Sequence, residues 1–183
     1  MNLQPSIRTH AAQFFEDERV LHDDIVTFFT EPIRKGHHLV MICERHTFDA
    51  VMDRLRTASE AALVQARSRL VYVDVDEAIS GFMVGRHVDP VRVEQGFEDL
   101  IGQVRRGDNK PIWLYGEMAG TLCRQGNYAA AEQLETLWNV HFPEPEFKVL
   151  CGYQMNLFDS EVHAESFRAI CSLHTHLTPT PPA

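Results

Sequence analysis

The chain has 183 residues and a net charge of −9, with 44% hydrophobic and 23% charged residues. This size and composition predict one soluble domain with a sizeable core. The acidic balance argues against a nucleic-acid-binding protein, and the sequence has neither an apolar run long enough for a membrane span nor the pattern of a signal peptide. We therefore expect a cytoplasmic protein whose four separated cysteines stay reduced.

The N-terminal fifth of the chain predicts a leader, a short apolar segment and an amphipathic helix. We expect residues 1–9 to form a flexible leader. Residues 10–15 are interpreted as an edge strand or an entry segment. A helix is then expected from Asp17 or Glu18 to Gly36, because apolar residues recur at helical spacing and glycine commonly ends helices.

A buried strand that runs directly into a helix is the next predicted unit. His38–Cys43 is a continuous apolar run, as in parallel strands covered on both faces, and a helix over 47–64 follows. In nucleotide-binding α/β proteins the turn between such a strand and helix contains glycines and a lysine that hold a phosphate. The turn Glu44–Thr47 contains neither residue type. The sequence therefore predicts a nucleotide-binding scaffold that lacks its phosphate-binding loop.

Three more strands and five more helices are predicted in the rest of the chain, from β-branched runs and from helix-start signals. A proline-rich end at 178–183 is expected to be a flexible tail or a linker, which leaves 10–177 as a single domain. The expected strands are Arg69–Asp74, Pro111–Tyr115 and Phe147–Tyr153, and the expected helices are Asp76–Met83, Val91–Arg105, Ala119–Arg124, Tyr128–Phe142 and Ser160–Leu173.

The order of these elements predicts the fold class. Helices and strands alternate along the chain, and the strands are apolar throughout. This pattern is typical of an α/β fold with a mostly parallel central sheet, helices on both faces and right-handed connections. We therefore expect a three-layer sandwich.

Several short motifs, taken in their order along the chain, resemble one known family. Together they extend from His10 to Pro179 and resemble the MEDS domain, named after methanogen and methylotroph proteins and the sensory part of the DcmR regulator. The motifs are His10-x-x-x-Phe14-Phe15, the strand within Gly36–Cys43, Gly116-Glu117-Met118, Glu132-x-x-Glu135-x-x-Trp138-Asn139, Leu150-Cys151-Gly152-Tyr153, and a closing His174 with a proline nearby.

The resemblance implies a fold distantly related to the RecA-like ATPase core of KaiC-type proteins, and it implies a signalling role. Such domains are thought to sense small molecules, hydrocarbon derivatives among them, and are often joined to kinase or DNA-binding modules. No such output module is present in this sequence. A free-standing sensor, a partner-binding protein and a fragment of a longer protein are the alternatives that follow.

Six side chains are predicted to line a ligand site at the carboxyl ends of the strands, where open α/β sheets bind ligands. Three of them lie in the turn after the first strand of the sheet, and one lies at or just after the end of each of the other three. The carboxylate that follows the third strand is the expected main polar contact. The six residues are Glu44, Arg45, Thr47, Asp74, Glu117 and Tyr153.

Each of these residues also has a structural interpretation. Thr47 is expected to cap the helix that follows it if no ligand binds there. Asp76 is the expected N-cap of the helix after the second strand. Glu117 is alternatively a buried, hydrogen-bonded acid that fixes a turn.

Neither a metal nor a cofactor nor a catalytic residue is predicted. Glu132 and Glu135 lie three apart on one helix, but Trp138 stands where a di-metal carboxylate motif requires histidine. A solvated helix face is expected there, with a polar network of Glu135 and Asn139 as the alternative. The ten histidines complete no tetrahedral ligand set in sequence, and no nucleophile motif is present.

The first hypothesis is therefore a non-enzymatic bacterial or archaeal sensory domain. It would bind a small molecule or a protein partner at this edge and regulate a kinase or a transcriptional output. The alternative is an atypical nucleotide-binding protein or a weak ATPase of the RecA/KaiC type, and a third hypothesis is an interaction module without a ligand. The acidic charge favours a histidine kinase or another regulatory protein as partner over DNA or a membrane, and self-association stays open.

Overall fold

One six-stranded parallel sheet forms the centre of the protein, with the strand order β3-β2-β6-β7-β1-β8. The computed structural model describes residues 9–105, 107–141 and 147–178. The predicted α/β class with a parallel sheet is confirmed. The strands are β1 Thr9–Phe15, β2 His38–Cys43, β3 Leu70–Asp74, β6 Ile112–Gly116, β7 Phe147–Gln154 and β8 His176–Thr178, and a separate hairpin pairs β4 Met83–Val84 with β5 His87–Val88.

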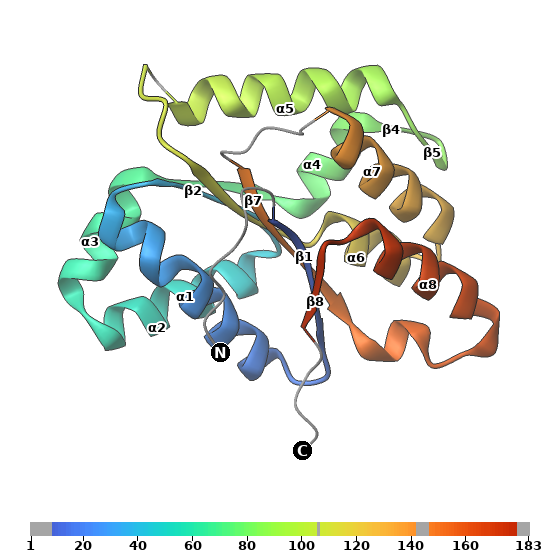
Figure 1. Ribbon diagram of the computed structural model, residues 1–183, viewed down its shortest axis with the longest axis horizontal. Coiled ribbons are helices and arrows are strands. Elements are labelled where there is room, and N and C mark those ends of the chain that lie inside the picture. The colour runs from blue at the N-terminus through green and yellow to red at the C-terminus, as the bar shows by residue number, and fades with distance from the viewer. Residues whose placement is uncertain (1–8, 106, 142–146, 179–183) are drawn as a thin grey trace.

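Helices cover both faces of this sheet, so the protein has three layers (Figure 1). One face carries α1, α2 and α3, and the other carries α4 to α8, since the two groups of helices contribute to two separate hydrophobic cores. The helices are α1 Glu18–Lys35, α2 Arg45–Ala58, α3 Glu60–Arg69, α4 Val75–Phe82, α5 Pro90–Arg105, α6 Met118–Arg124, α7 Tyr128–His141 and α8 Ala164–Leu173, with short 3₁₀ turns η1 Met155–Phe158 and η2 Glu161–His163.

Each central strand divides its side chains between the two cores, because successive residues of a strand point to opposite faces. In β2, Leu39 and Met41 pack against α1–α3, whereas Val40 and Ile42 pack against α4–α8. All six residues of β2 are buried. Burial on both faces explains why this strand is a continuous apolar run rather than an alternating one.

The ends of α1 confirm the capping signals in the sequence. Asp17 is the N-cap, and its side chain accepts a hydrogen bond from the backbone N–H of Arg19. Gly36 ends the helix in the left-handed conformation, with φ of 63°. This helix packs on the sheet through a stripe of residues that includes Leu21, Ile25 and Phe29.

Several elements differ from the sequence expectation, β8 among them, since no strand is predicted after residue 173. β1 is not an edge strand, because it lies between β7 and β8. The helix predicted over 47–64 is two helices, since Ser59 leaves the helical conformation and its hydroxyl accepts a hydrogen bond from the N–H of Ala62, in the first turn of α3. The hairpin β4–β5, with Gly85 at its turn, has no counterpart in the prediction.

Some of the sequence expectations lie outside the described residues, namely the leader up to residue 8, the end at Phe142 of the helix predicted from Tyr128, and the tail from residue 179. Thr178, expected in that tail, is instead the last residue of β8. Within the described residues, no helix has the length and apolar character needed to cross a membrane.

Candidate functional site

Three of the six predicted site residues meet at the start of α2. Glu117 follows β6, and its Oε2 accepts a hydrogen bond from the backbone N–H of Glu44 at 2.9 Å. Its Oε1 accepts one from the Tyr115 hydroxyl at 2.9 Å. Thr47, only 2% exposed, also hydrogen-bonds to Glu117 through its side chain. The Glu117 carboxylate is therefore held by three groups of the protein itself.

This arrangement places an internal carboxylate where a nucleotide-binding protein would place a phosphate. The amides at a helix N-terminus attract anions, and here the N–H of the N-cap residue Glu44 is already bound by Glu117. Burial raises the pKa of Glu117 above its ordinary value, although the hydrogen bonds from Glu44, Tyr115 and Thr47 act in the opposite direction. The Glu44 side chain pairs with Arg124 and with His46.

Arg45 and Asp74 lie nearby but make other contacts. Arg45 is exposed, pairs with Asp49 at 3.1 Å, and lies over the Phe48 and Tyr72 rings at 5.4 and 5.6 Å from their centroids. Asp74 is the N-cap of α4, and its carboxylate accepts hydrogen bonds from the backbone N–H groups of Asp76 and Glu77 at 3.0 and 3.3 Å.

Two capping assignments made from the sequence are therefore wrong. Asp74, not Asp76, caps α4, because α4 begins directly after the strand and Asp74 is the last extended residue. Thr47 does not cap α2, because Glu44 holds the N-cap position, and among the described residues the Glu44 side chain makes no capping hydrogen bond. Thr47 points inward to Glu117 instead.

Tyr153, the sixth predicted residue, lies in another part of the molecule. It is fully buried on the α4–α8 face of the sheet, where it stacks on Phe14 at a centroid distance of 5.5 Å. Its hydroxyl donates a hydrogen bond to Oε1 of Glu135. The structure therefore does not bring Tyr153 together with Glu44 and Glu117.

A cavity of about 370 Å³ opens between the sheet and the helices α4 and α5. It is larger than the space of about 30 Å³ beside Glu44 and Glu117. Arg92, Asp99 and Gln103 of α5 contribute polar groups to its lining. The apolar part of the lining includes Ile42, Val73, Phe82, Val93, Phe97 and Met118.

Two helical glycines leave part of this space open. Gly81 of α4 and Gly96 of α5 both line the cavity and are exposed. A Cβ atom added to either would meet no atom within 4 Å among the described residues. Glycine within a helix destabilises it by about 0.5–1 kcal/mol relative to alanine, so the open space has an energetic cost to the fold.

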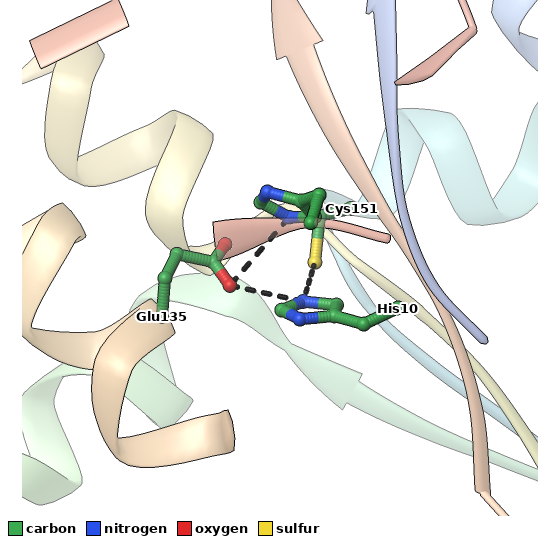
Figure 2. A group of neighbouring side chains, drawn as sticks. His10, Glu135 and Cys151 are labelled. Atoms are coloured by element: carbon green, nitrogen blue, oxygen red, sulfur yellow. Dashed lines mark hydrogen bonds and ion pairs between the residues drawn. The ribbon is translucent and has the colours of Figure 1, made fainter. Parts of the chain in front are cut away.

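A second group of polar side chains, three buried and one half-buried, lies in the same layer and forms the strongest candidate for a metal site. Oε2 of Glu135 lies 3.0 Å from Nε2 of His10, and Sγ of Cys151 lies 3.3 Å from that same nitrogen (Figure 2). Nε2 of His174 lies 3.6 Å from Oε2 of Glu135. One ligand atom from each of the four residues lies within 4.8 Å of all the others. We call this group, His10, Glu135, Cys151 and His174, the buried polar cluster.

The buried polar cluster overturns the expectation of a solvated helix face at Glu135, which is only 2% exposed. Burial by itself raises the pKa of Glu135, but the hydrogen bond with His10 and the nearby His174 lower it to about 2. Burial raises the pKa of the Cys151 thiol well above its ordinary value, and the Glu135 charge raises it further. Burial lowers the pKa of His174.

The sequence does not predict this cluster, although it contains one signal for it. Each of its four residues belongs to a different one of the short motifs that resemble the MEDS domain. The sheet register brings two of them together, because His10 pairs with Val149 and Ala12 pairs with Cys151 across adjacent parallel strands. The spacing of these residues in the sequence therefore gives no hint of their contact.

One protein-family model matches nearly the whole fold. The family model of the MEDS domain, described as the methanogen/methylotroph, DcmR sensory domain, matches residues 9–174. This range begins with β1 and ends just after α8, and it includes the cavity and all four residues of the buried polar cluster. A comparison with curated proteins finds no match.

Proposed function

Since the chain belongs to the MEDS family, we propose that it is a sensory domain that binds a small, mainly apolar molecule between α4, α5 and the sheet. The observation that carries this proposal is the cavity of about 370 Å³. Ligand pockets in proteins have volumes of about 300–1,000 Å³, are mostly apolar, and carry a few polar groups that orient the ligand. This cavity matches the lower end of that range, which favours a small molecule.

The position of the cavity supports the same proposal. Ile42 and Val73 line it, and each is the next-to-last residue of its strand, β2 or β3. The cavity therefore lies near the carboxyl ends of adjacent parallel strands, where open α/β sheets bind ligands. Arg92 and Gln103 lie about 16 Å apart along α5, so either one suits a hydroxyl or carbonyl at its own end of an otherwise apolar molecule.

Binding in this cavity would transmit a signal through α4 and α5. Helix α5 extends along one side of the molecule (Figure 1), and α4 exposes Asp76, Glu77 and Ser80 to solvent. A ligand held between them favours the one relative placement of the two helices that contacts it best. We propose that a kinase or a transcriptional regulator recognises the surface that this placement presents.

The alternative of nucleotide binding at residues 44–47 has less support. Glu44 and Glu117 are carboxylates at the position of the expected phosphates, and like charges repel. The space beside them is about 30 Å³, about a tenth of the size of a small ligand pocket. We therefore favour the cavity at α4 and α5 as the ligand site.

Titration of the protein with 1-hexanol and with benzene, followed by two-dimensional amide NMR, tests the proposal. We expect saturable chemical-shift changes centred on α4 and α5. The variant Gly96→Leu fills the cavity and should weaken hexanol binding at least tenfold, about 1.4 kcal/mol. Gly102→Leu is the matched control, because Gly102 lies on the same helix, outside the cavity lining, and a Cβ there also meets no atom within 4 Å among the described residues.

Three results would contradict the proposal. One is a titration without saturation, in which the shifts spread over the whole surface. Another is saturable binding that Gly96→Leu leaves unchanged, since the molecule would then occupy another site. Equal weakening by Gly96→Leu and Gly102→Leu is the third, because the effect would then come from the helix rather than from the cavity.

A further inference from the structure

Four side chains from four separate parts of the chain converge inside the α4–α8 layer. His10 comes from β1, Cys151 from β7, Glu135 from α7, and His174 follows the end of α8. Figure 2 shows Cys151 and Glu135 both pointing at the His10 ring. The side chains of His10, Glu135 and His174 are 7%, 3% and 0% exposed. Polar groups that are buried in this way are normally hydrogen-bonded, paired with an opposite charge or bound to a metal ion.

Outer hydrogen bonds fix which nitrogen of each histidine faces the cluster. The amide nitrogen of Asn139 donates to the Leu173 carbonyl at 2.8 Å, so its oxygen faces Nδ1 of His10 at 3.1 Å. Nδ1 of His10 must therefore carry a hydrogen. Nδ1 of His174 lies 2.7 Å from the Ile170 carbonyl oxygen and must also be a donor. Both Nε2 atoms are thereby directed at Glu135. Metal-binding histidines are characteristically oriented by such contacts on the other ring nitrogen.

Among the described residues, one inward nitrogen has no hydrogen-bond partner, and the other lies against both a thiol and a carboxylate oxygen. Nε2 of His174 is buried and has no hydrogen-bond partner in the part of the chain that the structure describes, since Glu135 is 3.6 Å away. Nε2 of His10 lies near both the Cys151 sulfur and Oε2 of Glu135. If it is neutral it can accept from the thiol, but its lone pair then faces a carboxylate oxygen at 3.0 Å. A cation between these atoms would give Nε2 of His174 a partner, and it would also lie between the lone pair of His10 and the carboxylate of Glu135.

We propose that the buried polar cluster binds one divalent transition-metal ion of the zinc type, through Nε2 of His10, Nε2 of His174, a carboxylate oxygen of Glu135 and Sγ of Cys151. Two imidazoles, a thiolate and a carboxylate are a donor set that suits zinc. Zinc bonds of about 2.0–2.3 Å in a tetrahedron place neighbouring donors about 3.3–3.8 Å apart. The observed separations are 3.0, 3.3 and 3.6 Å, and the widest pair lies within 4.8 Å.

Charge balance in the buried site supports the same assignment. On binding, the Cys151 thiol loses its proton to solvent and its sulfur bonds to the metal, while both histidines bind as neutral imidazoles. The two positive charges of the metal then match the charges of one thiolate and one carboxylate. Four protein donors close the coordination shell, as in structural zinc sites, which favours a site that holds the fold or switches it rather than one that performs chemistry. The metal site does not depend on the proposed ligand cavity.

The test uses the full chain, produced without a histidine tag and kept reduced. Mass spectrometry of elements measures metal per chain after purification, and we expect one zinc ion. After removal of zinc by a chelator, Co²⁺ serves as the probe, because its absorption reports both tetrahedral geometry and bonding to sulfur. We expect intense tetrahedral bands and a sulfur-to-cobalt charge-transfer band with a stoichiometry of one.

Graded variants separate a metal site from a structural contact. Cys151→Ser should abolish the charge-transfer band and weaken zinc binding at least about 100-fold, since loss of an outer partner alone costs about 10–100-fold. Asn139→Ala removes such an outer partner and should weaken binding within that range. Cys171→Ser is the control, because Cys171 is a free cysteine of α8 that lies outside the cluster.

The unmodified protein alone is sufficient to overturn the proposal, so a variant that fails to fold does not leave it untested. A chain that retains no metal and binds neither Zn²⁺ nor Co²⁺ with one-to-one stoichiometry would refute it. Cobalt binding without the sulfur band would refute the assignment of Cys151, and so would a band that Cys171→Ser removes. In the first of these cases the four side chains would form a hydrogen-bonded network without a metal.

Discussion

Glu117 and Asp74 each use a carboxylate to bind backbone N–H groups at the start of a helix. The sequence shows that both acids follow a buried strand, which is why a ligand edge was a reasonable expectation. It does not show whether the neighbouring amides are free. Since the amide of Glu44 and the amides of Asp76 and Glu77 are already bonded, these carboxylates stabilise the fold first. The sequence thus predicts that an acid follows each of these strands, but it does not predict which backbone amide the carboxylate binds.

The pH dependence of stability should reveal the burial of Glu117. Its pKa is raised in the folded protein above the ordinary value of 4.5, so the folded state binds more protons than the unfolded state above that pH. Stability from this residue is therefore lost as pH rises through the folded pKa. The variant Glu117→Gln lacks this loss, so urea unfolding should show its stability rising relative to the native protein over the interval upward from pH 4.5. A relative loss over that interval would contradict the account.

The capping role of Asp74 gives a second prediction. Asp74→Ala should lower the free energy of unfolding by about 0.5–2 kcal/mol, because two amides of the first turn of α4 lose their acceptor. Asp76→Ala, the matched control, should cost only about 0.3 kcal/mol from the lost charge near the helix N-terminus. Chemical denaturation of both variants measures this difference. Equal losses, or a larger loss in Asp76→Ala, would restore the assignment made from the sequence.

At the scale of elements, the strands that are buried on both faces were predictable, because short continuous apolar runs such as His38–Cys43 and Pro111–Tyr115 are typical of central parallel strands. The two strands beyond β7 in the sheet, β1 and β8, were less predictable. β1 contains His10 and Gln13, and β8 has only three residues, so neither has a strong strand pattern. Their position depends on the pairing of β1 with β7 and with β8. These strands are far from β1 in the sequence, so patterns within a short segment do not predict the pairing.

A close approach between α6 and β7 gives a prediction at this scale. A Cβ added to Gly120 would lie 2.4 Å from the carbonyl oxygen of Gly152, which is backbone and cannot swing away. Gly120→Ala should therefore destabilise the protein by about 1–3 kcal/mol. Gly102→Ala, in an open part of α5, should instead stabilise it by about 0.5–1 kcal/mol. Denaturant midpoints of the two variants should move in opposite directions, and a shared direction would contradict the packing described.

The turn between β2 and α2 gives another prediction. Titration with ATP and Mg²⁺ should give no saturable binding, because the Glu117 carboxylate occupies the amide at the start of α2 and Glu44 adds negative charge. Isothermal calorimetry at low ionic strength, where charge effects are largest, is the measurement. Micromolar binding that is abolished in Glu117→Ala would support the nucleotide hypothesis instead.

At the scale of the whole molecule, the buried polar cluster joins the first strand of the sheet to the segment after the last helix. Neither the cluster nor the cavity was predicted, because both are made by side chains from separate elements that share one face of the sheet. The order of motifs along the chain, by contrast, was enough to indicate the family. The family and the fold class can thus be predicted from the sequence, whereas the cluster and the cavity become visible only in the three-dimensional structure.

Removal of metal should therefore affect the stability of the whole fold. If zinc binds the folded chain and not the unfolded chain, free zinc at 1,000 times its Kd adds about 4 kcal/mol to the free energy of unfolding. Thermal unfolding should show a clear drop in Tm with chelator and recovery with zinc. Cys171→Ser should respond in the same way, whereas Cys151→Ser should not respond. A Tm that chelator leaves unchanged would contradict a metal bound between these elements.

If this domain binds a small apolar molecule between α4, α5 and the sheet, a crystal of the protein soaked with 1-hexanol will contain the alcohol in that cavity. We expect density for the alkyl chain against Val93, Phe97 and Met118, with the hydroxyl near Arg92 or Gln103. A cavity filled with ordered water, or one closed by α5 with the alcohol bound elsewhere, would contradict it.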